Sequence, residues 1–312
     1  MRSNVLSTLF TLITITVTSV LSVPFNVTTI HPRASQLGCG SNPSPSEVRA
    51  MESQFRELLR ADEEARMPPT DPPIPDDPDP PTPPPGPPKP ASVNVVWHNV
   101  YASTQAGNVG WLSDDLINKQ MAQLNRDYRG LFAFKLTKIN HVLNNIWHDK
   151  ADTGNAEEAA MKKALRVGGP ETLNIYSISM KSSSFIGYSS FPQDYNGNKV
   201  NDGIIITYTV LMNGGRPEYS LGRTLTHEVG HWTGLFHVFQ GGCADGDGLS
   251  DTAPQAGPNF GCPTFADSCP GGRVDNIHNY MDYTNDACRT QFTKQQKARM
   301  SDMCRFYRNI YP

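Results

Sequence analysis

The stretch T-H-E-V-G-H-W-T-G-L-F-H, residues 226–237, holds three of the eight histidines in this 312-residue chain. On a helix, residues four apart lie on one face, so His227 and His231 can direct two imidazole nitrogens at a common point. Glu228 stands beside that point, where a carboxylate can act as a general base on a water molecule. The pattern H-E-x-x-H therefore predicts a helix that carries two zinc ligands and a base.

The residues after this helix supply the rest of a catalytic metal site. Gly234 can end the helix in a left-handed conformation and so bring His237 round as a third ligand. Three protein ligands leave one position of a tetrahedral zinc open, which is typical of a catalytic site rather than a structural one. Downstream, Met281 in N-Y-M-D-Y can form a methionine turn beneath the ligands, and the complete pattern is the metzincin signature.

These residues predict peptide-bond hydrolysis. Zinc lowers the pKa of a bound water toward about 7, and Glu228 would take the proton and hand it to the leaving amine. Tyr283 can donate its phenol proton to the developing oxyanion, although an ordinary packed tyrosine is the alternative. We weigh two other functions. An inactive zinc-binding module would usually lack a ligand or the base, and an exopeptidase would need a group that holds a substrate terminus, which the sequence does not name.

Several stretches resemble the pappalysin family of metzincins, and most of all its secreted fungal metalloproteases. They are H-E-V-G-H-W-T-G-L-F-H-V-F-Q-G-G-C, D-G-L-S-D-T-A-P-Q and I-H-N-Y-M-D-Y-T-N-D-A-C. The resemblance implies an α+β fold with two lobes. The upper lobe would be a twisted, mixed five-stranded sheet with helices, whose edge strand, within residues 203–211, lines the cleft. The lower lobe would be loop-rich and stapled by disulfides. The resemblance also implies the roles given above for the histidines, Glu228 and Tyr283.

The same resemblance implies that Cys243 pairs with Cys269 and Cys262 with Cys288. Two cysteines remain, Cys39 and Cys304, and we expect a disulfide between them because an even count in a secreted chain favours full pairing. The alternative is that Cys39, in L-G-C-G-S, places its thiolate in the open zinc position and holds the enzyme latent.

The loop after the zinc helix is rich in oxygen ligands of the kind that calcium prefers. These are Asp245, Asp247, Asp251 and Thr252. Members of the resembled family can bind calcium near this loop, whereas a solvated acidic loop is an equal alternative. The expected cofactor is therefore one catalytic zinc, and a structural calcium in this loop is left open.

The N-terminal residues predict export from the cell. A positive Arg2, a short apolar run over residues 9–21 and small residues before the cut indicate a signal peptide, residues 1–22. A membrane anchor is the alternative, but a spanning helix needs roughly 20 predominantly apolar residues. The six cysteines suit an oxidising compartment, and the sequon at Asn26 predicts glycosylation.

Composition divides the rest of the chain. Residues 68–90 hold 14 prolines among 23 residues and predict an extended polyproline linker. It separates a helical segment, residues 23–67, which is a candidate propeptide, from a catalytic domain over residues 91–312. The formal net charge of −3 indicates neither a nucleic-acid surface nor a membrane patch. We therefore expect a secreted monomer whose partners are protein or peptide substrates.

Overall fold

The computed structural model describes residues 38–66, 89–103, 109–181 and 183–311. Residues 36–312 form one compact unit. The expected signal peptide, Asn26 and nearly all of the proline-rich linker lie outside the described residues, so these expectations stay predictions. Within the described part of the chain, no helix is long and apolar enough to cross a membrane.

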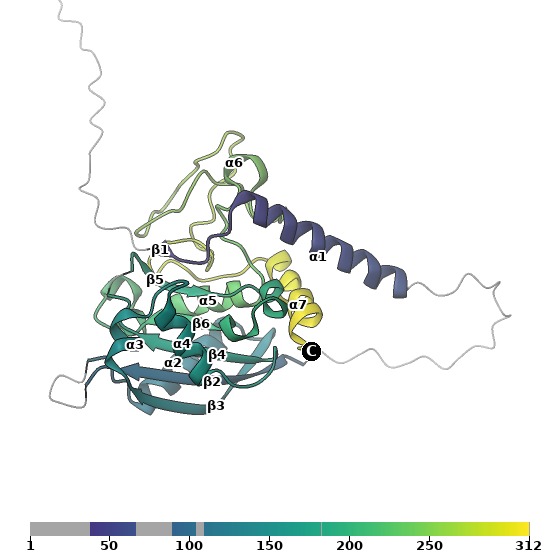
Figure 1. Ribbon diagram of the computed structural model, residues 1–312. Coiled ribbons are helices and arrows are strands. Elements are labelled where there is room, and N and C mark those ends of the chain that lie inside the picture. Colours follow the sequence, from purple (N-terminus) through teal and green to yellow (C-terminus); the bar gives the residue numbers. More distant parts are fainter. Residues whose placement is uncertain (1–37, 67–88, 104–108, 182, 312) are drawn as a thin grey trace, which may run out of the picture. The chain divides into compact units, whose positions relative to one another are not determined.

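A mixed sheet forms the centre of the fold, with strand order β1-β5-β6-β4-β2-β3 (Figure 1). Strands β2, β3, β4 and β6 run parallel to one another, whereas β5 runs antiparallel to β6. The two-residue β1 adds to β5 in parallel. The bounds are β1 (Gly38–Cys39), β2 (Ala91–Tyr101), β3 (Phe132–Leu143), β4 (Thr172–Ile178), β5 (Phe185–Ser189) and β6 (Ile204–Thr207).

The catalytic domain contributes five of these strands, as expected, but their order corrects one expectation. The strand within residues 203–211 is β6, and it lies inside the sheet between β5 and β4. The strand beside the active site is β5, whose five residues include a glycine and carry a weak strand pattern. The edge of the domain's own sheet is therefore β5, and β1 from the N-terminal segment covers that edge.

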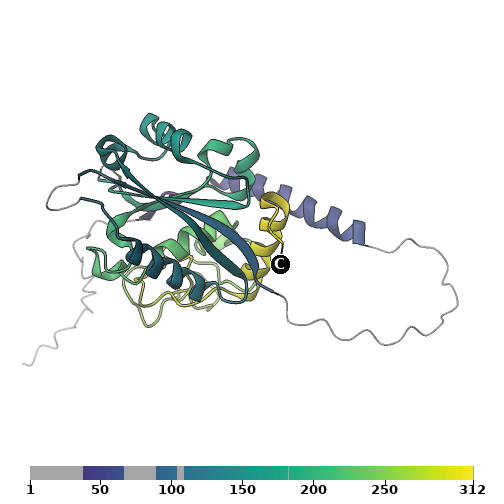
Figure 2. The same cartoon turned by 90° about the horizontal axis from the view of Figure 1, so that it is seen from below.

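Helices cover both faces of the sheet, as Figure 2 shows from below. Ser113 and Thr293 cap α2 and α7 through their side chains. From residue 246 to residue 293 the described chain contains no helix, which agrees with the expected loop-rich lobe. The bounds are α1 (Pro45–Arg66), α2 (Asp114–Asp127), α3 (Asn145–Lys150), α4 (Ala156–Leu165), α5 (Arg223–Trp232), α6 (Gly242–Asp245) and α7 (Lys294–Arg308).

Apolar cores lie on both faces of the sheet, and one of them contains residues of α5. On one face of the sheet, β4 contributes Leu173 and Ile175 to a core that also contains Val229 and Trp232 of α5. The alternate residues of β4 face a second core together with Met161 of α4. Strands buried on both faces are typical of parallel sheets. Helix α5, which carries the two predicted zinc ligands His227 and His231, is thus fixed by the main core of the molecule.

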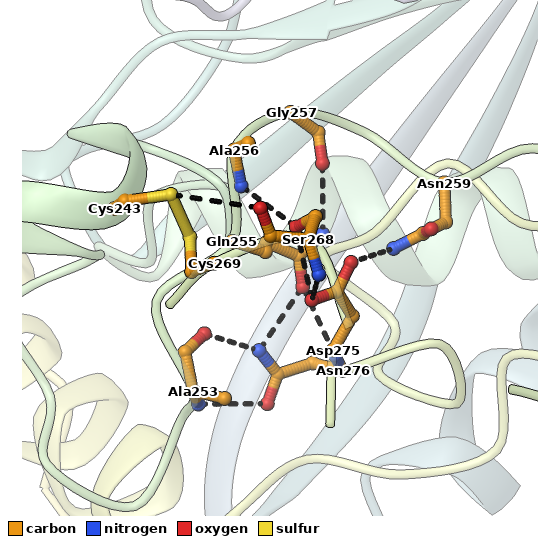
Figure 3. Close-up of a disulfide and its surroundings, with 10 residues drawn as sticks. All are labelled: Cys243, Ala253, Gln255, Ala256, Gly257, Asn259, Ser268, Cys269, Asp275 and Asn276. Atoms are coloured by element: carbon orange, nitrogen blue, oxygen red, sulfur yellow. Dashed lines mark hydrogen bonds between the residues drawn. A yellow bond between two sulfur atoms is a disulfide. The ribbon is translucent and has the colours of Figure 1, made fainter. Parts of the chain in front are cut away.

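Side-chain hydrogen bonds and disulfides order the irregular lobe (Figure 3). The carboxylate of Asp275 accepts from the backbone and the hydroxyl of Ser268, and from the amide of Asn259. Asn276 binds the backbone of Ala253 through both its oxygen and its nitrogen. Such bonds satisfy backbone groups that no helix or sheet pairs. The two implied disulfides, Cys243–Cys269 and Cys262–Cys288, are both present.

The expected disulfide between Cys39 and Cys304 is wrong, because both cysteines are free and buried. Cys304 lies on α7 within the main core. Cys39 lies on β1, with its sulfur 3.3 Å from Oε2 of Glu228. An even count of cysteines does not reveal that the two side chains face different parts of the molecule.

Candidate metal centre and active site

The three histidines of the quoted stretch converge. His227 and His231 lie one turn apart on α5, and their Nε2 atoms are 3.2 Å apart. Gly234 then adopts a positive φ of 102° and turns the chain. The turn brings Nε2 of His237 to 3.1 Å from Nε2 of His231. All three imidazoles are buried, so three nitrogen atoms face one point inside the protein.

The hydrogen bonds of two rings fix which nitrogen faces that point. Nδ1 of His227 lies 2.7 Å from the backbone oxygen of Tyr280, and Nδ1 of His231 lies 2.7 Å from that of Leu235. A carbonyl oxygen only accepts, so each Nδ1 carries the proton and each Nε2 keeps its lone pair. Burial lowers the pKa of His231 to about 4 and that of His227 and His237 well below the usual value. Neutral rings of this kind can act as metal ligands.

This donor set fits zinc. Nε2 of His227 and Nε2 of His231 both keep a lone pair, so at 3.2 Å they cannot hydrogen-bond to one another, and a cation between them would satisfy both. Neutral imidazole nitrogens in a set of three are the ligands that catalytic zinc takes. Their orienting carbonyl partners are of the kind that supports metal-binding histidines.

Met281 lies directly beneath the zinc helix. It is fully buried, and a Cβ at Gly230 would come within 2.4 Å of its sulfur. The backbone oxygen of Met281 also accepts from the amide of Val238, next to the third histidine. The methionine thus contacts the helix between the first two histidines and supports the chain at the third, which is the place expected for it.

Glu228 is fully buried beside the histidines. Burial raises the pKa of its carboxyl to about 8. Its Oε1 has no hydrogen-bond partner. On the β5 side it faces Gly187, where a Cβ would approach Oε1 to 2.8 Å. A carboxyl whose pKa lies near neutrality, with a free oxygen toward a cavity, has the properties of a general acid and base.

Tyr283 reaches the same point from the irregular lobe. Its hydroxyl lies 3.2 Å from Nε2 of His237 and accepts from the backbone amide of Cys39 at 2.9 Å. Burial raises the pKa of this phenol, so it stays protonated and able to donate. The structure therefore brings Tyr283 together with the histidines and Glu228.

Cys39 is the fourth group at this point. Its sulfur and one nitrogen of each of the three histidines all lie within 4.8 Å of one another. Among the described residues, these four side chains are the group that could hold a metal ion. Burial, and then the charge of Glu228, raise the pKa of the thiol well above its usual value. The glycines on either side of Cys39 allow close packing, because a Cβ at Gly38 would lie 3.2 Å from Tyr283 and one at Gly40 would lie 3.0 Å from Tyr188.

The four calcium candidates do not converge. Asp247 accepts from Thr252 and from the amide of Leu249, and burial raises the pKa of Asp247 to about 6. Asp251 instead accepts from the hydroxyl of Thr293 and the amide of Gln295 at the start of α7. Asp245 lies in α6.

A pocket beside Glu228 contains residues that the sequence did not single out. Its walls include Ile186 of β5, Tyr219, Thr224 at the start of α5, and Arg289. These side chains come from three separate segments of the chain. No motif joins them, and only the folded arrangement places them together.

Comparisons with known proteins agree with this geometry. Residues 173–305 match the family described as pregnancy-associated plasma protein-A. The chain is 38% identical over 283 residues to extracellular metalloprotease 1 of Coccidioides posadasii, covering 89% of this chain and 92% of that protein. It is 42% identical over 223 residues to an extracellular metalloprotease of Neurospora crassa, covering 70% and 76%.

Solved structures with the same fold come from Tannerella forsythia. Mature mirolysin in complex with a cleaved peptide superposes with a TM-score of 0.60 at 29% identity, covering 69% of this chain and 91% of that chain. A promirolysin mutant superposes with a TM-score of 0.64 at 26% identity, covering 86% and 93%.

Fold and site together define a zinc metallopeptidase with an α+β, metzincin-like catalytic domain. The chain belongs to the pappalysin family, named in the match above after pregnancy-associated plasma protein-A.

Proposed function

We propose that this protein is a secreted endopeptidase in which Glu228 is the general base and Tyr283 the oxyanion donor. The observation that carries the proposal is the convergence of three Nε2 atoms beside a buried carboxylate. The family supports proteins or peptides as substrates. The names of the relatives support an extracellular site of action.

Each side chain has a defined part in the reaction. His227, His231 and His237 would hold zinc, which when bound acidifies a water and polarises the scissile carbonyl. Glu228 would accept the proton of the attacking water and pass it to the leaving amine. Tyr283 would donate to the oxygen on which charge develops.

The edge of β5 would bind the substrate main chain. In the structure, Gly187 on this edge accepts from the amide of Gly40, and β1 fills the edge as an added strand. An extended peptide can use the same backbone groups once β1 has left. This places the scissile bond of a bound peptide next to Glu228, since Gly187 faces that carboxylate.

The test compares the protein with its Glu228→Ala and His231→Ala variants. After removal of the N-terminal segment, we expect casein cleavage by the parent protein that a zinc chelator abolishes. Glu228→Ala should keep its zinc and lose at least about 100-fold in activity, as loss of a general base does. His231→Ala should lose zinc and activity together. A parent protein that binds zinc but cleaves nothing after removal of the N-terminal segment would favour the inactive binding module.

We further infer that the described structure is the latent form and that the N-terminal segment is an inhibitory propeptide. Three contacts of Cys39 support this: its sulfur beside the three histidines, its amide on the hydroxyl of Tyr283, and its strand on β5. A thiolate is a good zinc ligand and would close the fourth position. The greater coverage of this chain by promirolysin than by mature mirolysin agrees with this inference.

Helix α1 anchors the inhibitory strand. The guanidinium of Arg299 lies 5.0 Å from the rings of both Phe55 and Phe236 and is ion-paired with Glu52. Farther along α1, Asp62 forms a bidentate pair with Arg305 at 2.6 and 2.9 Å. These contacts would hold Cys39 at the metal without a covalent bond.

The latency inference predicts that Cys39→Ala activates the full-length chain. Removing the sulfur opens the fourth zinc position, so cleavage of casein should begin without loss of residues 23–67. Cys304→Ala is the matched control, because it also removes a buried free thiol but lies in the core. Activity should rise at least about tenfold in Cys39→Ala and stay unchanged in Cys304→Ala. A tenfold rise corresponds to a change of about 1.4 kcal/mol in the free energy between the latent and the open form. Equal latency in both variants would contradict the inference.

The remaining expectations stay predictions. Cleavage after Ser22, glycosylation of Asn26 and a monomeric state can be read from the mass and sedimentation of the secreted protein. Calcium binding near Asp247 and Thr252 also stays a prediction. A calcium-dependent rise in the melting temperature, lost in Asp247→Asn, would support it.

A further inference from the structure

The pocket beside Glu228 has a distinct chemistry. With the N-terminal segment in place, only about 10 Å³ of space is left inside it. Gly38 and Cys39 lie along it, so the inhibitory strand now occupies its mouth. Because Glu228 and Tyr283 also line it, the side chain next to the scissile bond of a substrate would enter this pocket.

The charge in this pocket is already balanced. Arg289 is 3% exposed and is ion-paired with Oδ1 of Asp286. The other oxygen of Asp286 accepts from the amides of Leu221 and Arg223, at 3.0 and 3.1 Å. Both oxygens of the carboxylate are therefore engaged. Asp286 has no free oxygen for a cationic substrate side chain.

Two donors at the pocket have no partner. Nε of Arg289 and the hydroxyl of Thr224 are buried and make no hydrogen bond. Both residues line the pocket, and the rest of its wall near them is the apolar surface of Ile186 and the ring of Tyr219. Buried donors without partners are costly, and an acceptor supplied by the substrate would satisfy them.

We propose that Arg289 and Thr224 determine substrate specificity at this pocket, which takes an uncharged side chain ending in a hydrogen-bond acceptor, such as glutamine or asparagine, and excludes lysine and arginine. The proposal rests on the proposed peptidase function. A second cation would lie beside Arg289 without a free anion, which is a strong repulsive element. A carboxylate is disfavoured too, because Asp286 already balances Arg289 and Glu228 is near.

The test uses the full-length chain with Cys39→Ala and peptides that differ only at one position flanking the scissile bond. For peptides that carry glutamine, leucine or lysine there, we expect kcat/KM for glutamine to exceed that for lysine about 100-fold and that for leucine about tenfold. Arg289→Met keeps the bulk and frees Oδ1 of Asp286, so lysine should gain at least about tenfold. Thr224→Val should lower the preference for glutamine over leucine and leave lysine excluded.

A second readout separates this proposal from the proposed function. Matched peptide hydroxamates that carry glutamine or lysine are titrated into the same proteins by calorimetry, so that binding is measured without turnover. If no peptide is cleaved, the peptidase function fails, while the hydroxamate preference still decides the specificity. Equal affinity and equal kcat/KM for glutamine and lysine would overturn the specificity. Arg289→Lys keeps the cation and should keep excluding lysine, whereas a gain for lysine there as large as in Arg289→Met would also overturn it.

Discussion

Two backbone carbonyl oxygens determine which atoms of the site can bind metal. Those of Tyr280 and Leu235 hold the protons of His227 and His231 on Nδ1. The first comes from the methionine turn and the second from the turn after Gly234. The ligating nitrogens are therefore oriented by the fold itself, which lowers the cost of binding a metal.

A histidine outside the site predicts how the fold responds to acid. His98 is buried between Asn174 and Asn140 and stacks on Tyr176. Burial lowers its pKa to about 4, against about 6.5 in the unfolded chain. Below pH 6.5 the unfolded state binds more protons, so the free energy of unfolding should fall as the pH drops from about 6.5 to about 4. The loss from this group is at most about 3 kcal/mol, and it is absent above both pKa values.

Urea unfolding of the parent protein and His98→Gln at pH 7 and pH 4.5 checks this. The variant should be less stable at pH 7, because its fit between the two asparagines is poorer, but its stability should change less with pH. His278→Gln is the control, since that residue is exposed. An equal change with pH in the parent and in His98→Gln would contradict the assignment.

At the scale of single residues, local spacing determined what the sequence could predict. The positions of His227, His231 and Glu228 follow from helical geometry, and the turn at Gly234 follows from the freedom of glycine. The partner of Cys39 could not be predicted, because counting thiols says nothing of where their side chains point. Arg289 carried no signal, since its role depends on Asp286 and on a pocket built from distant segments.

Among the elements, α1 depends on the catalytic domain for its stability. One of its residues, Phe55, is buried. Ion pairs at Glu52 and Asp62 add to this contact. The arginine that binds Glu52 also donates from Nε to the backbone oxygen of Gly234, at 2.7 Å. The helix is thus connected to the turn that positions the third histidine.

The two ion pairs of α1 should differ in strength. Arg299 is 3% exposed and Glu52 16%, whereas Arg305 and Asp62 are 21% and 24% exposed. Glu52→Gln should therefore lower the free energy of opening of α1 by about 3 kcal/mol, because it leaves Arg299 buried without its anion. Asp62→Asn should have a clearly smaller effect, since water screens that pair.

Hydrogen exchange of the α1 amides, followed by mass spectrometry, measures both effects. Basal activity gives a second readout, because a helix that opens more often releases Cys39 more often. Glu52→Gln should then show higher activity than Asp62→Asn. The same exchange rates and activity in the two variants would mean that exposure does not rank these pairs.

Strand order was the part of the fold that the elements did not reveal. The family resemblance implied a mixed five-stranded sheet with helices, but it gave no order for the strands. β5 is short, and its F-I-G-Y-S sequence gives little alternation. Pairing between distant strands is set by tertiary contacts. The expectation therefore assigned the cleft to β6, whereas the strand beside the cleft is the preceding one, β5.

For the whole molecule, the irregular lobe needs its cross-links. Residues 246–293 contain no described helix and rely on side-chain hydrogen bonds and on two disulfides. Each disulfide joins cysteines 26 residues apart. Chain entropy alone gives each a stabilisation of roughly 3 kcal/mol. The two differ in position, because Cys288 immediately precedes Arg289.

Removing one disulfide at a time separates stability from function. The Cys262→Ala, Cys288→Ala double variant should lose stability and also activity, because Arg289 and the pocket wall lose their support. The Cys243→Ala, Cys269→Ala double variant should lose a similar amount of stability with nearly unchanged kcat/KM below its melting temperature. Thermal unfolding and peptide cleavage at 20 °C distinguish these results. Equal losses of activity in the two variants would contradict a local role of Cys288.

Gly187 has a consequence for how relatives of this protein are sorted into active and inactive enzymes. Genome surveys assign inactivity when a motif residue has been replaced. A valine at position 187 would leave every letter of H-E-x-x-H-x-x-G-x-x-H in place, yet its side chain would enter the space of the Glu228 carboxylate, where even a Cβ comes within 2.8 Å. Such an allele would be scored as a working enzyme, although its Glu228 carboxylate would have to move. Surveys of this family should therefore read the cleft strand together with the helix.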